Sequence, residues 1–172
     1  MSQDIHNYFA DYNALVVDES ADSRAIMSAV LGAFKLKSVT VADDYQKALK
    51  NIRTEQIDCI VIDWMSDTEH GLQLVRDVRN ANHHIANIPI ILCTARTDLG
   101  RLEEATKVGV DEIIAKPLKP DVVLKKLASA FYGRKSYVVN GDLANKRRRL
   151  NHPYKMKANQ SSDQQQSSRR PV

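Results

Sequence analysis

Several chemically useful side chains directly follow apolar runs that are typical of buried β-strands. The carboxyl ends of parallel strands lie at one edge of a sheet, which is where α/β proteins bind ligands. The sequence therefore predicts a site with three carboxylates, one hydroxyl and one ammonium. Its expected members are Asp18 and Glu19 after residues 14–17, Asp63 after residues 58–62, Thr94 after residues 88–93, and Lys116 after residues 112–115.

Such a group of carboxylates favours a hard cation with oxygen ligands, and Mg²⁺ fits because it binds through one or two carboxylates together with phosphate. We expect Asp18 and Glu19 to hold Mg²⁺. An aspartate in this setting can act as a nucleophile towards phosphorus. Thr94 would then donate a hydrogen bond to one phosphoryl oxygen and Lys116 would pair with another.

The rest of the chain alternates strand patterns with helix patterns. This alternation predicts a parallel sheet with right-handed crossovers and helices on both faces. Strands are expected at about 13–17, 38–42, 58–62, 88–93 and 112–115. Five helices are expected. The first covers 22–34, and the second is capped by Asp43 with Tyr45, Ala48, Leu49 and Ile52 facing inward. The others are marked by Leu72, Leu74, Val75 and Val78, by Leu99, Leu102, Ala105 and Val108 before a C-cap at Gly109, and by Val123, Leu124, Leu127 and Phe131 after an opening Pro120.

The polar run from Asn80 to His84 is interpreted as a solvated linker. It contains adjacent histidines, but neighbouring residues on a helix point about 100° apart. No third His or Cys stands nearby in the sequence. A metal site at His83 and His84 is therefore disfavoured.

The polar set at the strand ends, with Gly71 eight residues after Asp63 and a Lys-Pro pair leaving the last strand, resembles the receiver domain of two-component response regulators. The resemblance covers about residues 12–132 and is closest to single-domain, chemotaxis-regulator-like members. It implies a flavodoxin-like, doubly wound sheet of five strands in the order 2-1-3-4-5.

The resemblance also assigns roles to residues. Asp63 becomes the phosphoacceptor and, with the acidic pair Asp18 and Glu19, a ligand of Mg²⁺. The backbone carbonyl of Met65 completes the protein's Mg²⁺ ligands. Lys116-Pro117 would be a cis peptide. Phosphate binding and switching fall to Thr94, Lys116 and the small Ala95.

Two positions depart from the family pattern. An aromatic residue usually stands three residues before the lysine, where this chain has Ile113, and a proline usually stands where this chain has Asp67. The first departure puts the usual switch in question. Arg96, two residues after Thr94, is placed where it could reach phosphoryl oxygens or the carboxylates of the site, so we treat it as a modulator.

Charge divides the chain into two parts. Residues 1–133 carry 15 Lys and Arg against 19 Asp and Glu, whereas residues 134–172 carry 10 against 2. We expect an N-terminal lead-in (1–11) whose aromatic residues pack on the body, a receiver domain (12–133) and a basic, largely disordered tail (134–172). Apolar runs are too short for a membrane span, and two buried-type cysteines suit a cytoplasmic protein with free thiols.

The leading hypothesis is a single-domain response regulator. We expect it to accept a phosphoryl group on itself and not to be an enzyme, because no separate catalytic output domain is expected. A histidine kinase or phosphotransfer protein would phosphorylate it, and it would act on an output protein or as a dimer. One alternative is a receiver-like module that signals without phosphate, suggested by Ile113. Another is a nucleic-acid binder using Lys146 to Arg149. A hydrolase of similar fold is disfavoured because Met65, not a second aspartate, stands two residues after Asp63.

Overall fold

The computed structural model describes residues 8–64, 68–132, 138–139 and 142–143. Its centre is a five-stranded, fully parallel sheet in the order β2-β1-β3-β4-β5. The flavodoxin-like order 2-1-3-4-5 is thus confirmed. The strands are β1 (Asn13–Val17), β2 (Ser38–Ala42), β3 (Cys59–Ile62), β4 (Ile90–Thr94) and β5 (Glu112–Ala115).

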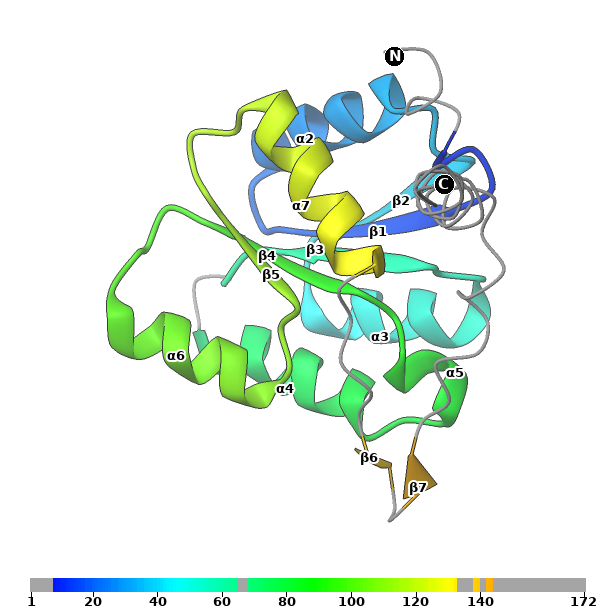
Figure 1. Ribbon diagram of the computed structural model, residues 1–172, viewed down its shortest axis with the longest axis vertical. Coiled ribbons are helices and arrows are strands. Elements are labelled where there is room, and N and C mark those ends of the chain that lie inside the picture. Colours follow the sequence, from blue (N-terminus) through cyan, green and yellow to red (C-terminus); the bar gives the residue numbers. More distant parts are fainter. Residues whose placement is uncertain (1–7, 65–67, 133–137, 140–141, 144–172) are drawn as a thin grey trace, which may run out of the picture.

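Helices cover both faces of the sheet (Figure 1). α2 (Ala21–Ala33) and α7 (Pro120–Tyr132) lie on one face, and the others lie on the opposite face. These others are α3 (Tyr45–Thr54), α4 (Thr68–Arg79), the short α5 (His83–Ala86) and α6 (Leu99–Val108). Within the described residues there are six helices where the sequence predicted five.

A hydrophobic core lies on each face of the sheet. Each buried strand contributes side chains to both cores, because successive side chains point to opposite faces of a sheet. In β1, Leu15 and Val17 face α3 and α4, whereas Ala14 and Val16 face α2 and α7. The same alternation runs through β3 and β4, whose residues are all buried. This double burial explains why the central strands read as continuous apolar runs in the sequence.

Two local predictions about helices need correction. The N-cap of α3 is Asp44, whose side chain accepts a hydrogen bond from the main-chain N of Lys47, and not Asp43. The predicted linker at 80–84 contains the start of α5, because Asn82 caps the main-chain N of Ile85 and the next residue, Ala86, is buried. The predicted C-cap at Gly109 is confirmed, with a left-handed φ of 115°.

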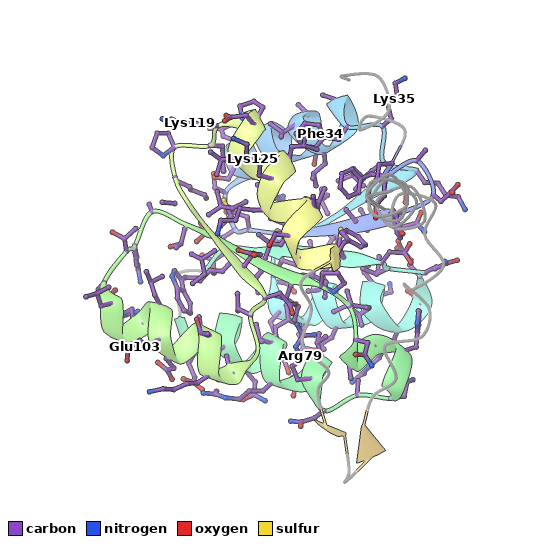
Figure 2. All side chains as sticks on the ribbon, viewed as in Figure 1. Phe34, Lys35, Arg79, Glu103, Lys119 and Lys125 are labelled. Atoms are coloured by element: carbon purple, nitrogen blue, oxygen red, sulfur yellow. The ribbon has the colours of Figure 1, made fainter. Side chains whose placement is uncertain are left out.

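A buried ion pair closes the amino edge of the sheet, where β4 and β5 begin. Arg79 of α4 lies on the face that α4 and α6 cover (Figure 2) and donates to Asp111 Oδ2 at 2.8 Å. Its guanidinium also donates to the carbonyls of Gly109, Ala86 and Ile88 at 2.9, 3.0 and 2.8 Å. Asp111 Oδ2 accepts from the main-chain N of Ile90 as well. The pair therefore fixes the ends of α4, α5 and α6 to the sheet.

The last part of the N-terminal lead-in packs on the body as predicted. Phe9 is fully buried, and its ring lies 5.7 Å from that of Phe131 near the end of α7. Of the predicted tail, the described residues form one small antiparallel pair, β6 (Val138–Val139) with β7 (Asp142–Leu143). The cluster Lys146 to Arg149 lies outside the described residues, so the prediction of disorder stays a prediction. No helix in the described ranges has the length and apolar character needed to cross a bilayer.

Candidate functional site

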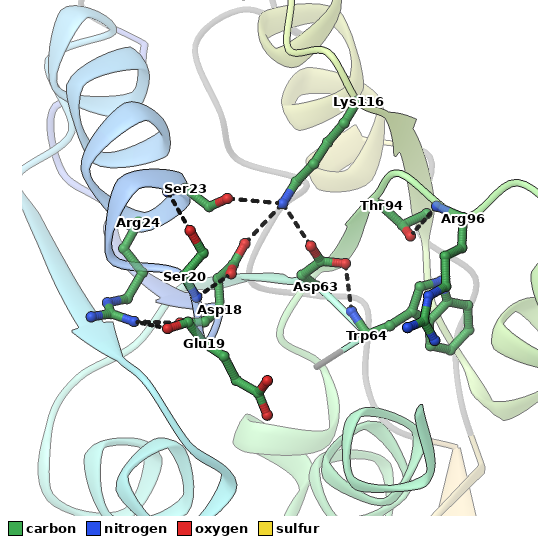
Figure 3. A network of polar contacts seen from close by, with 10 residues as sticks. All are labelled: Asp18, Glu19, Ser20, Ser23, Arg24, Asp63, Trp64, Thr94, Arg96 and Lys116. Carbon is green, nitrogen blue, oxygen red and sulfur yellow. Dashed lines mark hydrogen bonds and ion pairs between the residues drawn. The ribbon is translucent and has the colours of Figure 1, made fainter. Parts of the chain in front are cut away.

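Four of the predicted site residues converge at the carboxyl edge of the sheet (Figure 3). Asp18, Asp63, Thr94 and Lys116 come from the ends of β1, β3, β4 and β5. These strands are neighbours in the sheet, and their register places the ends side by side, for example Val17 beside Ile62 and Thr94 beside Ala115. Residues far apart in the sequence thus meet because Asp18, Asp63 and Lys116 directly follow their strands and Thr94 is the last residue of its strand.

Lys116 bridges the two aspartates. Its Nζ lies 2.6 Å from Asp63 Oδ2 and 2.9 Å from Asp18 Oδ2. The side chains of Lys116, Asp18 and Asp63 are 21%, 12% and 22% exposed, so solvent reaches the site from one side. The ammonium offsets the repulsion between two carboxylates that face each other.

The pKa of Lys116 reflects two opposing causes. Burial favours the neutral amine and lowers the pKa, but the hydrogen bonds to Asp63 and Asp18 favour the ammonium. The net result is a pKa raised above the ordinary lysine value. Lys116 is therefore a permanent cation at physiological pH and can pair with an anion brought to the site.

Main-chain donors fix the orientation of both carboxylates. Asp18 Oδ1 accepts from the main-chain N of Ser20 at 2.8 Å, and Asp63 Oδ1 accepts from the main-chain N of Trp64 at 2.7 Å. Each aspartate thus gives one oxygen to the backbone and presents the other to Lys116. Behind them, Gly71 is required, because a Cβ there would lie 2.9 Å from the carbonyl oxygen of Trp64.

Glu19 does not join this cluster. Its side chain is exposed, and Figure 3 shows its carboxylate directed away from Asp18 and Asp63. Met65, whose carbonyl was expected to complete the Mg²⁺ ligands, lies outside the described residues. Consistent with this, no three His, Cys, Asp or Glu residues of the described ranges are close enough to hold a metal ion.

The donor set that does converge still fits Mg²⁺. It consists of two carboxylates in a partly exposed position, and Mg²⁺ is commonly bound through one or two carboxylates while it keeps several waters. His and Cys are absent from the cluster, which argues against a softer metal.

Thr94 is fully buried at the end of β4. Its Oγ1 accepts from the main-chain N of Arg96 at 2.9 Å, which ties the following loop to the strand. Ala95 and Arg96 themselves are exposed. The carbonyl of Thr94 accepts from the main-chain N of Lys116, and the Lys116-Pro117 peptide is cis, as predicted.

Ile113 stands beside Leu92 in the sheet, two residues before the position that pairs with Thr94. Because side chains alternate, Ile113 and Thr94 share a face, the one covered by α4 and α6. Ile113 is partly buried there against the core. Its aliphatic side chain occupies the place where the family pattern has an aromatic ring.

Two residues near the site were missed by sequence reasoning. Ser23 Oγ lies 3.2 Å from Lys116 Nζ. Arg24 donates to the carbonyls of Asp18 and Glu19 at 2.7 and 3.0 Å and so holds the loop that carries the acidic pair. The available signal was their position in the first turn of a helix that begins directly after Asp18 and Glu19.

With this geometry established, the comparisons identify the class of protein. Residues 14–128 match the family described as the response regulator receiver domain. The chain belongs to this family, whose members are signalling modules phosphorylated by histidine kinases or phosphotransfer proteins and generally bind Mg²⁺ for that reaction.

Among particular relatives, chemotaxis regulators are prominent. The chain is 28% identical to chemotaxis protein CheY of Pseudomonas aeruginosa over 117 residues, which cover 68% of this chain and 94% of the relative. It is 32% identical to CheY1 of Helicobacter pylori, covering 66% and 91%. The solved structure of CheY4 of Vibrio cholerae is similar with a TM-score of 0.64 at 27% identity, covering 70% of this chain and 99% of that one. The chain is thus a CheY-like receiver domain.

Proposed function

We propose that this chain is a response regulator that accepts a phosphoryl group on Asp63 and signals through phosphorylation-dependent contact with another protein. The observation that carries the proposal is the bridge from Lys116 Nζ to Asp63 Oδ2 and Asp18 Oδ2, at 2.6 and 2.9 Å. A permanent cation beside a partly exposed carboxylate suits a group that gains further negative charge. We assign this function to residues 12–133.

The reaction follows from the residues present. One carboxylate oxygen of Asp63 attacks the phosphorus of a phosphohistidine donor, a P–O bond forms, and the P–N bond breaks with its electron pair leaving on the imidazole nitrogen. Lys116 pairs with one phosphoryl oxygen, and the Thr94 hydroxyl donates to another. Phosphoryl transfer needs mainly this positioning and charge neutralisation.

Asp18 and Asp63 would hold Mg²⁺, and Glu19 would join them by rotating its side chain. Arg24 fixes the backbone of Asp18 and Glu19, so only side-chain torsions of Glu19 need to change. A bound ion would supply positive charge that offsets the negative charge of the phosphoryl group. The Met65 carbonyl stays a proposed ligand.

The signal would leave through the loop after β4. A phosphoryl group on Asp63 draws the Thr94 hydroxyl inward, which breaks its contact with the main-chain N of Arg96. The segment 94–98 then shifts, while Ile113 moves little because an aliphatic side chain restricted at χ1 sweeps less space than a ring. An output protein, or a second copy of the chain, would read this change.

The experiment is incubation of the full chain with Mg²⁺ and acetyl phosphate, followed by intact mass spectrometry. We expect one added phosphoryl group on the wild type and on Asp22→Asn, which removes an exposed carboxylate from the first turn of α2. Asp63→Asn should add none. A wild type that stays unmodified under conditions that phosphorylate another receiver would contradict the proposal.

A further inference from the structure

We propose that Ser23 is a positioning residue that holds Lys116 across the two aspartates and so limits how readily a divalent cation displaces the ammonium. The inference rests on the proposed function, because the competing cation is the one that phosphorylation requires. It concerns a residue outside the polar set at the strand ends.

The position of Ser23 follows from the start of α2. Ser20 caps the helix by accepting from the main-chain N of Ser23 at 3.2 Å. This cap uses the backbone of Ser23 and leaves its hydroxyl for the site. Figure 3 shows that hydroxyl directed at Lys116, and the distance from Ser23 Oγ to Lys116 Nζ is 3.2 Å.

Ser23 completes the hydrogen bonds of the ammonium. A lysine ammonium has three donors and no acceptor. Among the described residues, Lys116 Nζ has three partners, namely Asp63 Oδ2, Asp18 Oδ2 and Ser23 Oγ. Two are charged and belong to the phosphorylation site, whereas Ser23 is neutral. Ser23 is therefore the partner that stabilises the bridging position without taking part in the reaction.

That position competes with a cation for the same atoms. The Oδ1 atoms of Asp18 and Asp63 are occupied by main-chain donors, and the facing Oδ2 atoms are occupied by Lys116. A cation held between the two carboxylates has to share or take over these Oδ2 atoms, and it repels the ammonium. Any contact that favours the bridging position of Lys116 therefore opposes cation binding.

The direction of the effect distinguishes this role from a structural one. If Ser23 anchors Lys116, then Ser23→Ala loosens the ammonium and tightens Mg²⁺ binding. A substitution that merely disturbed α2 would misplace Asp18 and weaken Mg²⁺ binding. A hydrogen bond to a charged group contributes less free energy when the groups are partly exposed. We therefore expect Ser23→Ala to bind Mg²⁺ about two- to fivefold more tightly than wild type.

The helix offers a matched control. Ser28 lies on α2 as well, and its hydroxyl is buried without a hydrogen-bond partner among the described residues. Ser28→Ala makes the same chemical change in the same helix but removes no contact with Lys116. Ser23→Thr keeps a hydroxyl at the site and serves as the conservative variant.

The first measurement is a Mg²⁺ titration of the full chain, followed by fluorescence of Trp64, which is the single tryptophan of the sequence and directly follows Asp63. We expect tighter binding in Ser23→Ala, and values close to wild type in Ser23→Thr and Ser28→Ala. Unchanged or weaker binding in Ser23→Ala, or an equal gain in Ser28→Ala, would overturn the inference.

The second measurement needs no metal. In metal-free protein, NMR detection of the Lys116 ammonium should show faster proton exchange with water in Ser23→Ala than in wild type, and equal exchange would overturn the inference. The phosphorylation assay then separates the two proposals. A phosphorylated wild type with no Ser23 effect rejects the inference alone, whereas a clear Ser23 effect without phosphorylation supports the inference and rejects the proposed function.

Discussion

Two charge networks lie at opposite edges of the same sheet. At the amino edge, Arg79 and Asp111 form an ion pair whose side chains are 7% and 5% exposed. At the carboxyl edge, Lys116 bridges Asp18 and Asp63, and these side chains are 12% to 22% exposed. Both networks join residues far apart in the sequence, but their other partners differ in kind.

Arg79 is held by main-chain carbonyls, and Asp111 also accepts from a main-chain N–H. These partners belong to the backbone and cannot be exchanged without unfolding. The partners of Lys116 are side chains that solvent reaches, so a cation or a phosphoryl group can replace them. A buried network whose partners are main-chain groups therefore stabilises the fold, whereas a partly exposed network of side chains can change its partners.

The largest effect should come from breaking the amino edge. Asp111→Ala leaves the buried Arg79 guanidinium without its counter-ion, which typically costs about 3–5 kcal/mol in the free energy of unfolding. Urea denaturation followed by circular dichroism measures this loss.

The control is Glu103→Ala, which removes an exposed pair with Lys107 whose charged atoms are 4.0 Å apart. It should change the free energy of unfolding by less than about 0.5 kcal/mol. If Asp111→Ala cost no more than this control, the amino edge would not have the structural role assigned to it.

At the carboxyl edge we expect the reverse pattern. Asp18→Asn replaces one carboxylate of the cation site by a neutral amide. Because Mg²⁺ prefers charged oxygen ligands, its affinity should fall by at least about tenfold. The free energy of unfolding should change by no more than about 1 kcal/mol, since the site is partly solvated. Trp64 fluorescence reports the first quantity and urea denaturation the second, with Asp22→Asn as the control. Unchanged Mg²⁺ affinity would remove Asp18 from the metal site.

The carboxyl edge was largely predictable from sequence because its signal is local. Asp18, Asp63, Thr94 and Lys116 each stand at the end of an apolar run, and parallel strands must bring such ends together. The sheet order came from family resemblance and is confirmed. The strand bounds agree within two residues, but β4 begins at Ile90 and not at residue 88, and it includes Thr94, which was expected to follow it.

The amino edge carried no such signal. Arg79 stands at the polar end of an amphipathic helix, where an arginine is ordinarily solvated, and Asp111 is 32 residues away. Their pairing depends on how α4, α5 and the loop before β5 pack. The contact of Ser23 with Lys116 and the direction of the Glu19 side chain also depend on side-chain positions. The periodicity of apolar residues in the sequence does not predict such positions.

A change at the carboxyl edge should spread into the loop that follows β4. Phosphorylation, or the mimic beryllofluoride, should increase hydrogen exchange of residues 95–98 by breaking the bond from the Arg96 main-chain N to Thr94 Oγ1. In Thr94→Ala this bond is absent from the start, so most of the change should vanish. Ile113→Ala should retain the increase in hydrogen exchange. If Ile113→Ala abolishes the change while Thr94→Ala does not, the signal passes through β5 instead.

At neutral pH, the smallest effect is expected in the core between the two edges. Burial is the main cause that raises the pKa of the Cys93 thiol to about 12. Between about pH 9 and 12, the unfolded chain loses this proton and the folded chain keeps it. The free energy of unfolding should therefore be unaffected at neutral pH and fall by up to about 1.4 kcal/mol per pH unit above pH 9. Urea titrations at several pH values should show a shallower fall in Cys93→Ala; equal slopes would contradict the assignment.

The side chains at the carboxyl edge can exchange their partners, and we propose that this serves the phosphorylation of Asp63. The most direct test is to treat the full chain with Mg²⁺ and acetyl phosphate, reduce the acyl phosphate with borohydride, and map the product by peptide mass spectrometry. Reduction converts a phosphorylated aspartate into homoserine and leaves free carboxylates unchanged. We predict homoserine at position 63, in a yield that falls strongly in Lys116→Met. Homoserine at position 18 or elsewhere, or none in a protein that binds Mg²⁺, would contradict the account.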